Sequence, residues 1–172
     1  MDPAREMEIP VLDSPTFVLA LLCALGSGLI AGVFLAFSAF VMRALARLPP
    51  AQGIAAMQSI NIAVIHPAFL GIFLGTAVLC AGAIIAALLR WSAPGGTFVL
   101  AGAALYLAGT FLVTIAANVP WNDRLAAMAP DDPAAAETWR LYSRRWTAWN
   151  HVRTLAALAA SGSFIVAIRS GW

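Results

Sequence analysis

The sequence contains two histidines, His66 and His151, and these are the side chains best suited to proton transfer or metal binding. Imidazole exchanges protons near neutral pH and ligates metals, so each histidine is a candidate general base or metal ligand. A lone histidine in an apolar segment can equally serve only as a hydrogen-bonding residue. The sequence leaves both roles open for each.

Amides and one arginine accompany the histidines. Asn118 and Asn122 are four residues apart and share a helix face, where their amides could fix a ligand oxygen or satisfy carbonyls freed by Pro120. Arg153 precedes an apolar run too short to cross a bilayer alone, which places its guanidinium below the membrane interface. There it needs Asp123, an asparagine or a bound anion as partner, unless it snorkels back to the interface.

Aromatic residues run up to this arginine at helical spacing. Steps of three or four residues place five side chains on one helix face: Trp139, Tyr142, Trp146, Trp149 and Arg153. An aromatic belt at the headgroup level explains such a stripe, and so does the wall of a ligand site.

The elements that position these residues are membrane helices. Hydrophobic residues make up 62% of the 172-residue chain and charged residues only 10%, about half the usual charged share. Residues 16–42, 54–89 and 91–122 carry no charged side chain, and each stretch exceeds the roughly 20 residues that cross a bilayer. The fourth apolar run, residues 154–168, is shorter and must recruit residues before it.

We therefore expect one all-α domain over residues 1–172. It is predicted to be a four-transmembrane-helix bundle with short interfacial helical extensions before the second and fourth spans. The expected spans are about 15–43, 62–90, 97–119 and 149–169. Proline geometry predicts a kink at His66-Pro67 and a break beside Asn118, two residues before Pro120.

Small residues in the spans indicate how the helices pack. Gly28 with Gly32, and Gly71 with Gly75, are spaced to let backbones approach closely in lipid. The two cysteines, Cys23 and Cys80, lie within apolar spans and are interpreted as small buried hydrophobes.

An even number of spans brings the polar residues to one membrane face. The end of the first and third spans and the start of the second and fourth all meet there. Polar groups are costly in lipid unless paired, so their convergence predicts a functional site, with a hydrogen-bonded structural cap as the alternative. The converging residues are Gln58, Asn61, His66, Asn118, Asn122, Asp123, Trp146, Trp149, Asn150, His151 and Arg153.

Charge excludes some partners and indicates an orientation. The net charge is +2, lysine is absent and the ten basic residues are scattered arginines, so no nucleic acid is expected. Most arginines follow the first and third spans, which predicts a multi-pass protein of the cell (inner) membrane with both termini outside the cytoplasm. The expected partners are membrane lipid and a hydrophobic small-molecule substrate, and a homo-oligomer is left open. Zinc-ligand spacing, a nucleophile elbow, a phosphate loop and a dinucleotide fingerprint are all missing from the sequence.

Four segments form a recognisable pattern: GLIAGVFLAFSAFVMRAL from Gly28, AMQSINIAVIHP from Ala56, NVPWNDRLA from Asn118 and WRLYSRRWTAWNHVRT from Trp139. They resemble the anthrone-oxygenase-like family of four-helix membrane proteins, over nearly the whole chain. The resemblance implies oxidation of an anthrone-type or phenolic molecule by molecular oxygen without a classical redox cofactor.

The resemblance also implies roles for the polar residues. His66 or His151 would remove a proton from an acidic carbon, while Arg153 and the amides of Asn118 and Asn122 would stabilise the oxyanion. The remaining expected substrate contacts are Gln58, Asn61, Asn150 and the aromatic wall of Trp146, Trp149, Phe37 and Phe69.

Two other functions stay open. His66 and His151 as axial haem ligands would give an electron-transfer protein or haem-dependent oxidase, or they would bind another metal. A polar end that only holds a lipid or regulatory ligand would give a non-enzymatic binding protein.

Overall fold

The computed structural model describes residues 14–129 and 132–172. Residues 1–13 and 130–131, which belong to the predicted single domain, lie outside the described part. Four helices are long and apolar enough to cross a membrane, Pro15–Leu45, Pro67–Leu89, Gly96–Ala126 and Ala135–Arg169. The predicted all-α bundle of four transmembrane helices is thereby confirmed, and the chain is a multi-pass membrane protein.

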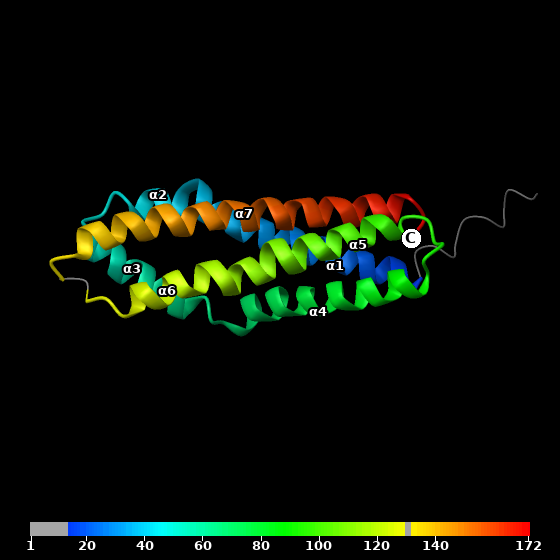
Figure 1. Ribbon diagram of the computed structural model, residues 1–172, viewed down its shortest axis with the longest axis horizontal. Coiled ribbons are helices and arrows are strands. Elements are labelled where there is room, and N and C mark those ends of the chain that lie inside the picture. The colour runs from blue at the N-terminus through cyan, green and yellow to red at the C-terminus, as the bar shows by residue number, and fades with distance from the viewer. Residues whose placement is uncertain (1–13, 130–131) are drawn as a thin grey trace, which may run out of the picture.

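The helices run alternately up and down beside one another (Figure 1). Several of them are built from segments of α and π geometry. In chain order the segments are α1 (Pro15–Ala36), η2 (Phe37–Val41), α2 (Met42–Leu45), α3 (Pro50–Ala63), α4 (Pro67–Leu89), α5 (Gly96–Ala104), η3 (Leu105–Leu112), η4 (Thr114–Asn118), α6 (Val119–Ala126) and α7 (Ala135–Arg169).

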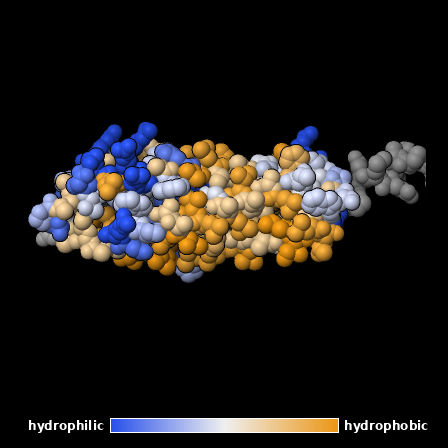
Figure 2. Space-filling model, in the orientation of Figure 1, coloured by the Kyte–Doolittle hydropathy of each residue, from blue (hydrophilic) through white to orange (hydrophobic). Residues whose placement is uncertain are grey.

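Helix lengths separate a membrane layer from a polar end. The 23 residues of α4 rise about 35 Å, close to the roughly 30 Å hydrocarbon core. The other three membrane-crossing helices have 31, 31 and 35 residues and extend further. They extend toward the side where α2, α3, α6 and the first half of α7 gather, which we call the polar end. Hydrophilic residues concentrate there, an apolar belt covers the middle of the molecule, and a smaller hydrophilic area lies at the opposite end (Figure 2).

The second predicted span differs at its start. His66 has extended backbone angles of φ −114° and ψ 139°, so α3 ends at Ala63 and α4 begins at Pro67. The expected kink is therefore a full break, because Pro67 disfavours helical geometry at His66. The interfacial extension before the second span is a separate helix.

The third span does not break beside Asn118 as predicted. The helix continues through Pro120 because η4 has π geometry, with the Val119 N–H donating to the Thr114 carbonyl five residues earlier. A wider turn removes the close approach between the proline ring and the preceding turn that would interrupt an α-helix.

The membrane half packs through small residues, although not at the predicted pairs. A Cβ on Gly109 would lie 2.5 Å from the Ala156 Cβ, so α7 approaches η3 closely there. A Cβ on Gly32, Gly71 or Gly75 would have no neighbour within 4 Å, and one on Gly28 would meet only the Ser161 hydroxyl at 3.3 Å. Cys23 and Cys80 are free thiols buried in this apolar core, as interpreted from the sequence.

Candidate functional site

A buried guanidinium lies where the polar end meets the membrane half. Arg153 is only 4% exposed and donates from Nη2 to the Asn150 Oδ1 at 2.6 Å and from Nη1 to the Thr114 Oγ1 at 3.2 Å. In the described part of the chain it forms no ion pair with a carboxylate. A buried charge without a counter-ion is costly, so such a group marks a site prepared for negative charge.

Aromatic rings compensate part of this cost. The Arg153 guanidinium carbon lies 4.1 Å from the centre of the Phe34 ring and 5.1 Å from that of Trp146. Ring faces attract cations, most strongly where water is excluded. The Arg153 Nε and the Trp146 Nε1 remain buried without a hydrogen-bond partner among the described residues.

Asn150 connects this charge to the first helix. Its buried amide nitrogen donates to the Phe34 carbonyl and to the Ser38 Oγ, both at 2.7 Å. Because the Ser38 oxygen accepts from Asn150, the Ser38 hydroxyl hydrogen is free to donate elsewhere. The amide dipole, held at its oxygen by Arg153, favours negative charge at whatever the Ser38 hydroxyl contacts.

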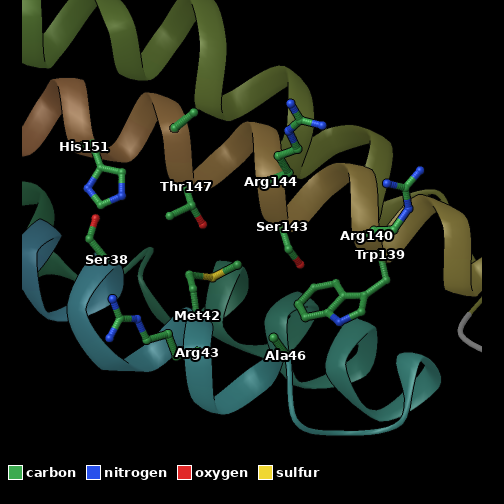
Figure 3. A pocket seen from close by; sticks show the side chains of 11 residues that line it. Ser38, Met42, Arg43, Ala46, Trp139, Arg140, Ser143, Arg144, Thr147 and His151 are labelled. Atoms are coloured by element: carbon green, nitrogen blue, oxygen red, sulfur yellow. The ribbon is translucent and has the colours of Figure 1, made fainter.

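Ser38 also lines a cavity of about 680 Å³ between η2–α2 and α7, which is widely open to the surface and has exposed residues, His151 among them, on its wall. At one end of this cavity the His151 imidazole points toward the Ser38 hydroxyl, and Trp139 lies at the other end (Figure 3). The volume is in the range of small-molecule sites. The lining residues are Ser38, Met42, Arg43, Ala46, Trp139, Arg140, Ser143, Arg144, Thr147, Ala148 and His151.

The predicted asparagines of the third span contact α7. Asn118 is buried and its Nδ2 donates to the Trp146 carbonyl at 3.2 Å, while its Oδ1 has no partner in the described part. Asn122 accepts at Oδ1 from the Tyr142 hydroxyl at 2.9 Å. These bonds fix η4 and α6 against the aromatic stripe and leave one buried acceptor free.

Gln58 and Asn61 lie on α3. The Gln58 Nε2 donates to the carbonyls of Leu125 and Met128, at 2.8 and 2.9 Å, and so ties α3 to the end of α6. The Asn61 Nδ2 is buried and has no partner among the described residues. Gln58 therefore has a structural contact, and Asn61 retains a free donor.

The other predicted residues are dispersed. The His66 Nδ1 accepts from the Ala68 N–H at 3.2 Å and caps α4 in an exposed position. Phe37 packs on Trp146 with 5.6 Å between ring centres, whereas Phe69 stacks on Phe73 in the apolar core at 5.8 Å. Trp149 is 42% exposed and lines a second cavity of about 280 Å³ on the outer surface.

Comparison with known proteins identifies the family. A sequence model described as anthrone oxygenase matches residues 68–163, more than half of the chain. The chain belongs to the anthrone oxygenase family. No curated protein and no solved structure matches it.

The matched region of this anthrone oxygenase family member covers α4 through most of α7. It includes the buried Asn118, Asn150 and Arg153, together with His151. Ser38, on the other wall of the cavity, lies before the matched region. The α7 wall of the site therefore lies within the matched residues, and the η2–α2 wall lies before them.

Sequence reasoning missed four residues of the candidate site: Ser38, Arg43, Thr114 and Thr147. Ser38 and Thr114 are hydroxyl residues inside charge-free spans, at the membrane level of the predicted asparagines, and that position was their available signal. The sequence could not predict the contact between Ser38 and Asn150, because this contact depends on how the first helix is rotated relative to α7. In residues 14–129 and 132–172, no three His, Cys, Asp or Glu side chains are placed to hold a metal ion together.

Proposed function

We propose that the protein is a membrane oxygenase that oxidises a hydrophobic aromatic or phenolic small molecule with molecular oxygen. The reaction takes place in the cavity between η2–α2 and α7. One observation carries the proposal: the Ser38 hydroxyl at the cavity accepts from Asn150, which in turn is held by the buried, unpaired Arg153. Positive charge thus acts on the cavity through a short chain of hydrogen bonds, which suits a substrate oxyanion.

The proposed reaction converts a methylene group between two aromatic rings into a ketone. A base removes one proton from the carbon, and the resulting carbanion transfers electrons to oxygen and forms a carbon–oxygen bond, giving a peroxide. Loss of the second proton from the same carbon breaks the oxygen–oxygen bond. The products are the ketone and one water, so the balance is R₂CH₂ + O₂ → R₂CO + H₂O.

Residues of the cavity fit the two roles this reaction needs. His151 is the base, since its imidazole lines the cavity and imidazole is the side chain that most often serves as a general base. When an anthrone loses this proton, the negative charge is delocalised onto the oxygen of its ring ketone. Ser38 donates a hydrogen bond to that enolate oxygen. Met42 and Trp139 supply apolar and aromatic surface for a flat ring system.

Electron transfer from the carbanion to oxygen requires no redox cofactor, so we propose that none is resident. The competing haem protein would use His66 and His151 as axial ligands. An absorption spectrum of the purified protein separates the two functions. A Soret band corresponding to one haem per chain would support the haem protein and contradict the cofactor-free oxygenase.

Oxygen consumption tests the proposal. Protein in lipid nanodiscs, supplied with an anthrone, should consume one O₂ per ketone formed and place one atom of ¹⁸O₂ in the ketone. Ser38→Ala should slow turnover about 10²-fold or more, whereas Ser59→Ala, an exposed serine on α3, should not. No consumption above the protein-free rate, over a panel of anthrones and phenols, would instead favour a non-enzymatic binding protein.

The proposed location is the cell (inner) membrane, with both termini outside the cytoplasm and the polar end at the cytoplasmic surface. The support is the excess of arginines at the polar end over the opposite end, where Arg90 and Arg169 lie. Periplasmic alkaline phosphatase fused to the C-terminus should be active. Inactivity of that fusion together with activity of one inserted between α3 and α4 would reverse the orientation.

A further inference from the structure

A second, smaller cavity lies on the outer surface between the third membrane-crossing helix, Gly96–Ala126, and α7. It shares no residue with the cavity beside Ser38. Its volume is about 280 Å³, which is below the range typical of sites that enclose a whole small molecule. The cavity therefore suits one end of a ligand whose remainder lies outside. Its lining residues are Ala116, Ala117, Pro120, Trp121, Arg124 and Trp149.

Helix length places this cavity at the edge of the bilayer. From Trp149 to Arg169, α7 rises about 30 Å, which is the thickness of the hydrocarbon layer. Tryptophan favours the headgroup region of a membrane. Within two helical turns deeper in the membrane, both helices expose apolar side chains, namely Leu112, Ile115, Val152 and Leu155. The cavity thus opens where lipid headgroups meet acyl chains.

Arg124 supplies the charge of this cavity. Its guanidinium carbon lies 5.0 Å from the centre of the Trp121 ring, and in the described part of the chain it forms no ion pair. Stacking on the indole positions the guanidinium and leaves its N–H groups free to donate. No acidic side chain lines the cavity. The lining therefore attracts a phosphate oxygen and offers no counter-charge to an ammonium group.

We propose that this cavity binds the phosphate group of an anionic phospholipid. Arg124 donates to the phosphate oxygens, and the acyl chains lie along the exposed apolar side chains that follow the cavity into the membrane. A zwitterionic headgroup would bring its ammonium group to Arg124, so a headgroup with net negative charge is preferred. The inference goes beyond the proposed function, because it concerns neither the substrate nor the reaction. A lipid that contacts both helices binds only the folded protein and therefore stabilises it.

Native mass spectrometry tests the site with phosphatidylglycerol and phosphatidylcholine as probes. The protein in detergent is mixed with equal amounts of the two lipids, and the bound molecules of each are counted. The unaltered protein should hold one phosphatidylglycerol at least about tenfold more tightly than phosphatidylcholine, and Arg124→Gln should hold one fewer. Arg90→Gln is the matched control and should hold as many as the unaltered protein. Arg90 also stacks on a tryptophan, 5.4 Å from the Trp172 ring centre, but lies at the opposite end.

A further variant separates the cavity from its charge. Ala116→Leu fills the cavity from an exposed position and keeps every arginine, so it should also lose one phosphatidylglycerol. Thermal unfolding without lipid verifies that the variants are folded. Added phosphatidylglycerol should raise the unfolding temperature of the unaltered and Arg90→Gln proteins more than that of the other two. Equal retention of both lipids by the unaltered protein would overturn the inference, and so would an unchanged phosphatidylglycerol count in Arg124→Gln or in Ala116→Leu.

Discussion

The two halves of the bundle bury their side chains in opposite ways. In the membrane half the core consists of alanines, cysteines and a few aromatic rings, and even the Tyr106 hydroxyl is satisfied by the Phe73 carbonyl at 3.0 Å. In the polar end, Arg153, Asn118 and Trp146 are just as buried, yet each keeps an atom without a partner in the described part of the chain.

This difference indicates that the membrane half supports the fold and that the polar end carries the functional residues. Unsatisfied buried polar atoms cost stability, and native proteins retain them mainly where function needs them. Among the described residues the membrane half has two such side chains, Ser27 and Trp172, against five at the polar end, so we interpret the membrane half mainly as the scaffold that holds the helices in register. Substitutions in the two halves should therefore change different measurements.

The largest effect is expected at the base. His151→Gln should lower turnover of an anthrone by about 10²–10⁴-fold, because an amide cannot accept the proton at neutral pH. His66→Asn provides the matched control, since asparagine can cap α4 as His66 does and its turnover should stay within about twofold. Oxygen uptake measures both, and loss of activity in the second variant alone would move the base to His66.

The next effect is expected at the buried charge. Arg153→Met should lower turnover by about 10²–10³-fold, because the Ser38 hydroxyl loses the positive charge behind it. The fold should also lose about 1–3 kcal/mol of stability, because the buried Asn150 Oδ1 loses its hydrogen-bond donor. Oxygen uptake and thermal unfolding in detergent measure the two effects. If the Arg153→Met protein unfolds at growth temperature while its folded fraction keeps normal activity, Arg153 has a structural role only.

A smaller effect, on stability alone, is expected in the membrane half. Gly109→Val would force a side chain against Ala156 and should destabilise the fold by about 1–3 kcal/mol. Gly82→Ala is the control, because a Cβ there meets nothing within 4 Å. Thermal unfolding in detergent gives the stability. A changed rate per folded molecule in Gly109→Val would contradict the division into two halves.

The smallest effect is expected at Gln58. Gln58→Ala removes two hydrogen bonds to carbonyls at the end of α6 and should cost about 1–2 kcal/mol. Gln52→Ala, at an exposed position on the same helix, should change the unfolding midpoint very little. A selective loss of substrate affinity in Gln58→Ala would return this residue to the substrate contacts predicted from the sequence.

The sequence predicted the fold well because bilayer thickness dictates the length of apolar segments. It also predicted one membrane level for Asn118, Asn150 and Arg153. Arg153 donates to Asn150 there, whereas Asn118 donates to the Trp146 carbonyl, and a shared functional site for these residues stays a prediction. It could not predict the π-helical turns, because these depend on how η2 and η4 adjust to their neighbours. Ser38 lies within η2, so its position at the cavity depends on that local geometry.

The uninterrupted α7 has a mechanical consequence. From His151 to the last helical residue, Arg169, the helix rises about 27 Å, nearly the thickness of the hydrocarbon layer. One continuous helix thus anchors the protein and sets the depth of His151, the proposed base, near the edge of the hydrocarbon layer. An apolar molecule dissolved in the bilayer can reach this depth directly, and a thicker bilayer would bury His151.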